Sequence, residues 1–243
     1  MPLKRAFKVW CGLLAATVLG CAISIRWLDI RIALFFIKNV NRFALLGMGL
    51  GSGILVSGEI ILIIGLAITH MVRGSLPNFA KALFVSCCAS LSAFVANDHV
   101  LKVVFGRLPP AVLLHRIPTH VFHFFRGGQF SSFPSGHMVM ASAFALAMIR
   151  LQSRTLPILT VLLCIGASLL IVGDWHFLGD VIAGAFIGGT AGFAAGELWL
   201  EHEKGRGGAR QHHANSAEFR GILAQSTPPR IRRRELRTLT TML

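Results

Sequence analysis

The strongest constraint on the fold of this chain is a set of long apolar runs. A run of about 20 apolar residues can cross the hydrocarbon core of a bilayer as a helix. We identify six such runs, at residues 9–25, 50–71, 80–99, 136–150 (extended backwards by its loop), 156–173 and 180–199. Only 14% of the residues are charged, whereas a soluble domain has about 25%. The sequence therefore predicts an all-α, polytopic membrane protein built as a bundle of six transmembrane helices.

The composition changes after the sixth run, which divides the chain into two parts. Residues 1–199 form the predicted membrane domain, and its chemically informative core is 95–199. Residues 200–243 contain few large apolar residues, several glycines and three adjacent arginines. Such a composition is typical of disorder, so we predict a disordered basic tail that could rest on anionic lipid headgroups. Nucleic acid is not an expected partner of a membrane-tethered tail, although the net charge is +14.

The positive charges also predict an orientation. With the six runs threaded through a membrane, Lys and Arg are more frequent on the side that holds both termini. This excess favours cytoplasmic termini and places the opposite loops on the periplasmic face of a bacterial-type inner membrane. The first run resembles a signal peptide, but five further runs follow it, so we expect an uncleaved first helix.

Three further patterns concern packing and the membrane surface. In the external segment 26–49, apolar residues at helical spacing favour an amphipathic interfacial helix; they are Ile30, Ala33, Leu34 and Ile37. Glu59 lies inside the second run, where we favour a side chain bonded within the bundle over a functional acid. Four glycines at four-residue spacing in the sixth run favour close helix packing within the chain over dimerisation; they are Gly184, Gly188, Gly192 and Gly196.

Two short motifs carry the chemistry. Pro134-Ser135-Gly136-His137 opens the fourth run, and His176-Phe177-Leu178-Gly179-Asp180 opens the sixth. The residues between the two histidines would span about 57 Å as helix, which is close to two crossings of a core about 30 Å thick. The two histidines should therefore return to one membrane face. Lys102 and Arg107, at the end of the third run, should lie on that face too.

The first motif suits phosphate binding. Free backbone N–H groups at a helix start bind phosphate, Gly136 permits close approach of the backbone, and the Ser135 hydroxyl can donate or cap. His137 could then act as a general acid towards a leaving oxygen.

The second motif suits attack on phosphorus. His176 and Asp180 are four residues apart and are neighbours on one helical turn. A carboxylate bonded to one ring nitrogen fixes the tautomer and leaves the other nitrogen free to attack. Lys102 and Arg107 would hold the non-bridging oxygens and offset charge developing in the transition state.

These motifs in this order resemble the type 2 phosphatidic acid phosphatase (PAP2) superfamily, the membrane relatives of vanadium haloperoxidases. The family pattern is K-x6-R-P, then P-S-G-H, then S-R-x5-H-x3-D, and the resemblance covers roughly 95–199. It implies that His176 is the nucleophile, Asp180 its orienting acid and His137 the general acid. It further implies that Lys102, Ser135 and Gly136 bind phosphate, and that no metal or other cofactor is needed.

The sequence departs from the family pattern at two arginines. The first family arginine falls at Pro109, and the Ser-Arg pair falls at Leu169-Leu170. Arg107 could replace the first arginine, and Arg126, just before the Pro-Ser-Gly-His motif, could replace the second. The departures are also compatible with a changed substrate preference or a loss of catalysis. Three histidines of the intervening loop are expected to be surface residues rather than headgroup ligands; they are His115, His120 and His123.

The sequence thus predicts a metal-independent membrane phosphatase acting on lipid phosphates or diphosphates through a phosphohistidine. By resemblance, candidate substrates include phosphatidate-like lipids, polyprenyl diphosphates and the phosphates of lipid A. Two alternatives stay open. The first is a lipid-linked phosphotransferase, and the second is a non-catalytic lipid-phosphate binder or transport component.

Overall fold

The computed structural model describes residues 3–40, 51–113 and 122–226, and every regular element in these ranges is a helix. The all-α prediction is therefore confirmed for this part of the chain. Because His115 and His120 lie outside the described residues, their expected surface positions stay predictions.

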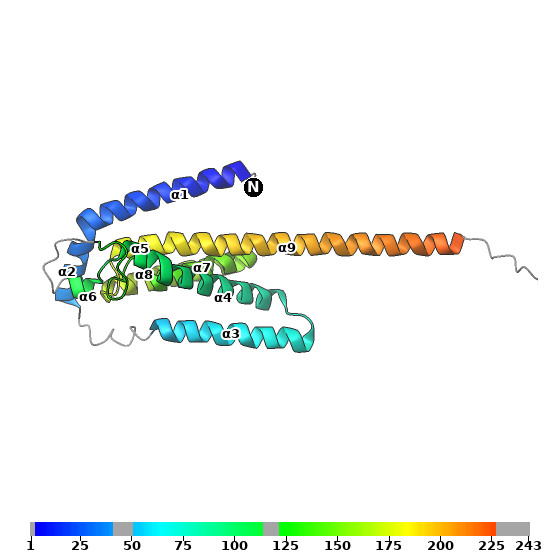
Figure 1. Cartoon of the computed structure of the whole chain (residues 1–243), viewed down its shortest axis with the longest axis horizontal. Coiled ribbons are helices and arrows are strands. Elements are labelled where there is room, and N and C mark those ends of the chain that lie inside the picture. The colour runs from blue at the N-terminus through cyan, green and yellow to red at the C-terminus, as the bar shows by residue number, and fades with distance from the viewer. Residues whose placement is uncertain (1–2, 41–50, 114–121, 227–243) are drawn as a thin grey trace, which may run out of the picture. The chain divides into compact units, whose positions relative to one another are not determined.

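The amino-terminal part consists of two helices joined by a π-helical turn. Helix α1 spans Leu3–Ile23, the turn η1 spans Ser24–Leu28 and helix α2 spans Asp29–Asn39. Helix α1 contacts α9, where Trp10 Nε1 donates a hydrogen bond to Thr190 Oγ1 over 3.3 Å. The chain turns at η1, so that α2 lies across one end of the bundle (Figure 1).

Helix α2 corresponds to the predicted amphipathic helix, but its expected apolar face is divided. Ala33 is buried in a small apolar cluster with Phe177, whereas Ile30 and Leu34 are exposed. The helix therefore both covers the end of the bundle and presents apolar side chains outwards. Residues 41–49 of the same external segment lie outside the described residues.

The next helices form an antiparallel pair. Helix α3 spans Gly51–Arg73 and α4 spans Asn78–Ala96. A π-helical turn η4, Asn97–Leu101, and the short helix α5, Lys102–Phe105, continue α4 towards the end of the bundle where α2 lies (Figure 1). Lys102 is thereby carried to that end.

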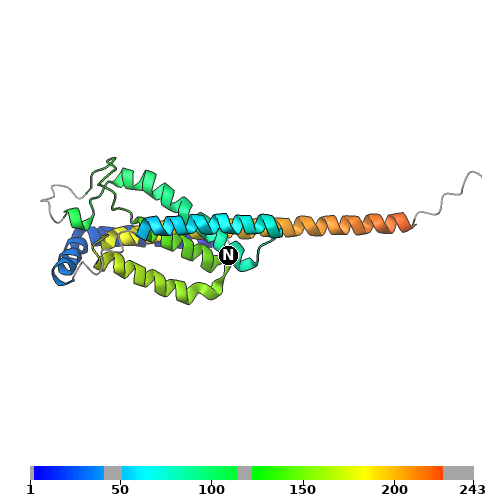
Figure 2. The same cartoon turned by 90° about the horizontal axis from the view of Figure 1, so that it is seen from below.

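The remaining helices include the most buried one. They are α6 (Pro110–Leu113), α7 (Gly136–Leu151), a 3-10 turn η5 (Ser153–Thr155), α8 (Leu156–Val172) and α9 (Leu178–Ser226). Helix α7 packs against both α4 and α8 and lies between them in Figure 2. Val139, Ala143 and Ala147 of α7 are fully buried, so α7 is the centre of the bundle.

The four spaced glycines of α9 pack against α7. A β-carbon at Gly188 would lie 2.2 Å from Val139 O, and one at Gly192 would lie 2.1 Å from Ala143 O. Real β-carbons do not approach backbone oxygen this closely, so only glycine permits the observed helix separation. The prediction that this glycine stripe, formed by Gly184, Gly188, Gly192 and Gly196, serves packing within the chain is confirmed.

Glu59 is also used within the bundle. The Ser90 hydroxyl of α4 donates a hydrogen bond to Glu59 Oε1 over 2.8 Å and lies 3.1 Å from Met140 O of α7. The expected bonding of Glu59 inside the bundle is therefore confirmed, and one hydroxyl joins three helices.

The outer surfaces of the helices are apolar. Large side chains such as Leu13 (56%), Ile61 (70%) and Ile158 (61%) are more than half exposed, which soluble proteins rarely permit over continuous surfaces. Among the described residues, five helices are long and apolar enough to cross a membrane. These features are those of an integral membrane protein.

The predicted count of six spans is not confirmed. Five of the predicted runs correspond to the long apolar helices, but α7 has only 16 residues. At 1.5 Å per residue it is about 24 Å long, which is shorter than a core of about 30 Å. Because its neighbours enclose it, α7 does not need to match the thickness of the lipid.

The predicted disorder of the tail is not confirmed over residues 200–226, where α9 continues as helix to Ser226. Residues 227–243 lie outside the described residues. The chain divides into two compact units, of which the first is Met1–Trp199 and the second begins at Leu200. All the predicted site residues belong to the first unit.

Candidate active site

His176 lies in the turn between α8 and α9. The backbone N–H groups of Trp175 and His176 both donate to Leu170 O, over 3.1 and 3.2 Å, and Asp174 adopts a positive φ of 54°. These bonds end α8 and reverse the chain, so that His176 lies one helical turn before Asp180. His176 Nδ1 is 3.7 Å from Asp180 Oδ2, which is longer than a hydrogen bond.

The Ser132 hydroxyl lies between these two side chains. It donates to Asp180 Oδ2 over 2.6 Å and is 3.4 Å from His176 Nδ1. The hydroxyl can accept from an Nδ1–H while donating to the carboxylate. The predicted histidine–acid pair is thus a three-member arrangement in which a serine connects the two.

Asp180 is completely buried and fully paired. Oδ2 also accepts from the backbone N–H of Phe177 over 3.1 Å, and Oδ1 accepts from Arg107 Nη1 over 2.5 Å. A buried carboxylate is stable only with such partners. Asp180 therefore has hydrogen-bond partners both on the side that faces His176 and on the side away from it.

His137 faces His176 from the start of α7. The ring centroids of the two histidines are 6.0 Å apart, with an interplanar angle of 65°. Within the described part of the chain, His137 Nε2 is buried and has no hydrogen-bond partner. A buried nitrogen of this kind is available to a ligand placed between the two rings.

The residues before His137 form a helix start. Ser135 is the N-cap of α7, and its hydroxyl accepts from Met138 N over 3.4 Å. Ser135 N donates to Asp180 O over 3.1 Å, so the starts of α7 and α9 are joined directly. Asn97 Nδ2 donates to Pro134 O over 3.3 Å and fixes the loop from the side of η4.

Lys102 reaches the start of α7 from the side of α5. A β-carbon at Gly136 would lie only 3.3 Å from Lys102 Nζ, so glycine leaves the space in which the ammonium group lies. Lys102 Nζ is also paired with Asp98 Oδ1 over 2.7 Å. The structure therefore brings together Lys102, Ser135, Gly136 and His137, as the sequence predicts.

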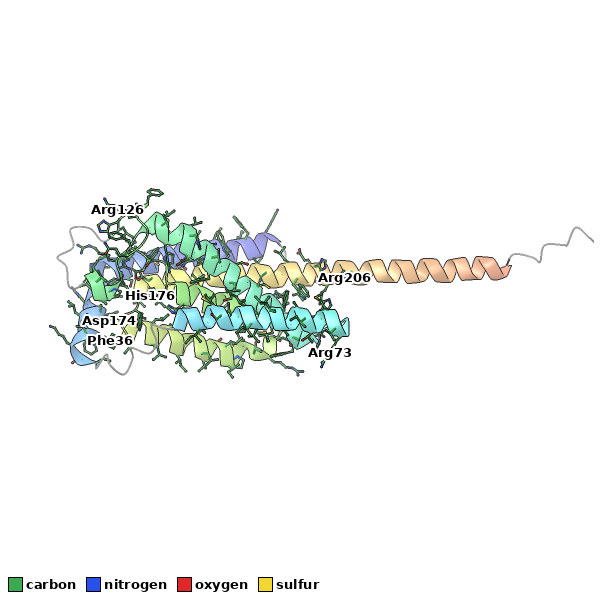
Figure 3. The ribbon with its side chains drawn as sticks, turned by 60° about the horizontal axis from the view of Figure 1, so that its bottom comes forward. Phe36, Arg73, Arg126, Asp174, His176 and Arg206 are labelled. Atoms are coloured by element: carbon green, nitrogen blue, oxygen red, sulfur yellow. The ribbon has the colours of Figure 1, made fainter. Side chains whose placement is uncertain are left out.

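The two arginines proposed as replacements lie in different surroundings. Arg107 is 1% exposed, and both of its terminal nitrogens are paired with carboxylates, those of Asp180 and Asp29. Arg126 is exposed in the loop before α7, at the same end of the bundle as His176 (Figure 3). Direct phosphate binding by either arginine stays a prediction. In the structure, Arg107 forms its ion pairs with Asp29 and Asp180.

Sequence reasoning missed Ser132 and Asp29. Ser132 lies three residues before Ser135, and its proximity to the motif was the one available signal. Asp29 belongs to no motif. In the sequence it is an acid just after the first apolar run, where surface acids are common. His123 is half-buried and its ring lies 4.5 Å from that of Phe130, so it is not the simple surface residue that the sequence suggested.

Among the described residues, no group of three or more His, Cys, Asp or Glu side chains is arranged to hold a metal ion. The site consists of two facing histidines, a buried acid, a lysine and a helix start, at one end of a bundle of apolar helices.

This combination defines an integral membrane protein with two facing histidines beside a lysine and a buried acid. The model of the PAP2 superfamily matches residues 80–201, half of the chain, and the chain belongs to this superfamily. No curated protein and no solved structure matches the chain. At the level of the family, membership supports a phosphoric ester hydrolase.

Proposed function

We propose that the chain is a metal-independent phosphatase of lipid phosphates or diphosphates that forms a phosphohistidine on His176. One observation carries the proposal: the rings of His137 and His176 face each other at 6.0 Å beside Lys102 and the start of α7. Residues from three separate segments thus surround the place where a phosphoryl group would react.

The phosphate would be bound by charge and by the helix start. Lys102 supplies a cation, and the first backbone N–H groups of α7 supply donors together with the positive end of the helix dipole. Gly136 supports this role because it presents no side chain at the position where Lys102 Nζ approaches the helix. Asp98 would share Lys102 with the phosphate.

In the first step, His176 Nε2 attacks phosphorus, and the bond between phosphorus and the lipid oxygen breaks. His137 gives a proton to the leaving oxygen, which departs as the lipid alcohol or as the lipid monophosphate. Ser132 and Asp180 keep the Nδ1–H of His176 in place, so that Nε2 carries the lone pair. The ring charge that develops is balanced by the Asp180 carboxylate.

In the second step, water attacks the phosphohistidine, and His137, now neutral, takes the proton from that water. The phosphorus–nitrogen bond breaks, inorganic phosphate leaves, and both histidines return to their starting states. The proton given to the leaving group is thus recovered from water.

The membrane setting suits a lipid substrate. The helices around the site expose apolar surfaces that a bilayer would cover, so a lipid tail could lie beside the bundle while its phosphate reaches the site. From the distribution of Lys and Arg we propose cytoplasmic termini and a site on the periplasmic face of an inner membrane.

The proposal is tested with purified protein in detergent, a chelator, and a panel of phosphatidate, a polyprenyl diphosphate and lipid A. We expect release of inorganic phosphate from at least one of them, lost in His176→Ala and retained in His70→Ala. His70 lies in the last turn of α3, away from the site residues, and is a matched control.

Three results separate the candidate functions. Phosphate release that depends on His176 supports the phosphatase. Transfer of the phosphoryl group to a second lipid, without free phosphate, would replace the phosphatase with a phosphotransferase. Saturable binding of a lipid phosphate without any turnover would leave a non-catalytic binder.

A further inference from the structure

We propose that Asp29 is a positioning residue that acts through Arg107 to hold Asp180 behind His176. The inference rests on the proposed function and adds a part of the chain to it that no motif marks. Asp29 begins α2 and lies far before the region that the family model matches, residues 80–201.

The three charged side chains form a continuous buried chain. Arg107 Nη1 donates to Asp180 Oδ1 over 2.5 Å, and Arg107 Nη2 donates to Asp29 Oδ2 over 2.6 Å. All three side chains are at most 1% exposed. Ion pairs with this geometry between buried side chains are strong and directional, so a displacement of Asp29 is transmitted to Asp180.

Asp29 itself is fixed at two further points. Its Oδ1 accepts from Ser24 Oγ over 2.6 Å and from Gly179 N over 3.0 Å. Gly179 lies in the first turn of α9, immediately before Asp180, where free N–H groups require partners. Asp29 is therefore connected to Asp180 in two ways. One is through the side chain of Arg107, and the other is through the backbone N–H of Gly179, the residue before Asp180.

Arg107 is held so that it cannot turn away. Its Cζ lies 4.1 Å from the ring centroid of Phe177 and 5.5 Å from that of Phe122, and cations over aromatic rings are attracted to them. The backbone oxygen of Arg107 accepts from Ser132 N over 2.9 Å. Arg107 thus positions Asp180 with its side chain and Ser132 with its backbone.

The charges explain why a second acid is needed. Without Asp29, Arg107 and Asp180 would form a neutral pair, and Arg107 would offset most of the charge that Asp180 directs at His176. With Asp29 present, the three side chains carry a net charge of about −1 when ionised. That charge is available to balance the positive ring that forms when His176 is phosphorylated.

A double-mutant cycle tests the inference by measuring kcat and KM for Asp29→Asn, Asp180→Asn and the double variant. In metal sites, loss of an outer partner that orients a ligating side chain typically costs about 10- to 100-fold in activity, and we apply the same scale to a partner that orients a catalytic acid. We expect Asp29→Asn to lower kcat by about 10-fold or more with KM little changed. In the Asp180→Asn background the same change should lower kcat less than about 2-fold, because its target is gone.

A merely structural role gives a different result. If Asp29→Asn lowers kcat by the same factor in both backgrounds, or leaves kcat of the folded protein unchanged, the inference is overturned. Absence of turnover in the wild type would overturn the proposed function together with this inference, whereas turnover with multiplicative effects overturns this inference alone.

Two more variants guard against simple misfolding. Glu197→Gln removes the acid from the ion pair that joins Arg150 of α7 to α9 outside the site, and it should lower the unfolding temperature without lowering kcat. Ser24→Ala keeps all charges and removes one bond to Asp29. If Asp29→Asn does not fold, a loss of kcat in Ser24→Ala that disappears in the Asp180→Asn background supports the inference, and an unchanged kcat contradicts it.

Discussion

The hydroxyl of Ser132 donates a hydrogen bond to Asp180 Oδ2 over 2.6 Å. Because the same oxygen is 3.4 Å from His176 Nδ1, whereas the carboxylate is 3.7 Å from it, the serine lies nearer to the histidine than the acid does. Orientation of His176 thus depends on a hydroxyl as well as on a carboxylate.

Ser132→Ala is therefore predicted to lower kcat without abolishing turnover. The loss of one charge-assisted hydrogen bond corresponds to about 1.5–3 kcal/mol, which is at least about 10-fold in rate. KM should change little, because Ser132 touches Asp180 rather than the lipid phosphate. Ser131→Ala is the matched control, since it removes the neighbouring hydroxyl, which has no hydrogen bond to His176 or Asp180. Equal kinetics for the two variants would contradict the role assigned to Ser132.

The sequence could predict the site as far as its parts lie in motifs. The positions of His137, His176 and Lys102 follow from helix length and from the return of the chain to one face, and the structure brings them together. Ser132 and Asp29 could not be predicted, because their roles depend on side-chain contacts across 48 and 78 positions in the chain, to Asp180 and Arg107 respectively. No local pattern records such contacts.

His137→Gln is predicted to slow both steps by removing the proton donor and acceptor. General acid–base catalysis typically contributes about 10²- to 10⁴-fold, so kcat for a lipid phosphate should fall within that range. With an aryl phosphate whose leaving group needs no proton, the first step should be affected much less. Rapid-quench measurements should then show a burst of product equal to the amount of enzyme, because the phosphohistidine would accumulate.

The comparison of the two substrates is decisive for this role. His70→Ala should show wild-type kinetics with both, since this side chain lies in the last turn of α3. If His137→Gln loses the same factor with the aryl phosphate as with the lipid, and shows no burst, His137 is not the proton donor.

Lys102→Met is predicted to reduce turnover through loss of phosphate binding. A single group that stabilises developing charge contributes about 10²- to 10³-fold to kcat, and loss of the cation should also raise KM. Methionine keeps most of the side-chain length, so the packing of Lys102 against Gly136 and Phe94 is largely preserved. Lys8→Met, on the exposed surface of α1, removes the same charge away from the site and should leave both constants unchanged. Unchanged kinetics in Lys102→Met would exclude Lys102 from the site.

The length of an apolar run predicts the bounds of the helices that face lipid. It does not show whether an apolar helix faces lipid or is enclosed by other helices. Helices α3 and α8 match the predicted runs within a few residues, because lipid-facing helices must be apolar along their whole length. Helix α7 is also apolar but has only 16 residues. Its length is limited by the turn at Gln152 and by the N-cap at Ser135, and neighbouring helices bury it.

The glycine stripe yields a stability prediction that is independent of activity. A β-carbon at Gly188 would lie 2.2 Å from both Val139 O and Ser142 Oγ, so Gly188→Ala must push α7 and α9 apart. Such overpacking typically costs about 1–3 kcal/mol, and the unfolding temperature in detergent should fall. The matched control is Gly58→Ala on α3, where a β-carbon meets nothing within 4 Å. There alanine should be neutral or slightly stabilising, because it favours helix by about 1 kcal/mol over glycine. Equal unfolding temperatures for the two variants would show that the stripe does not set the separation of α7 and α9.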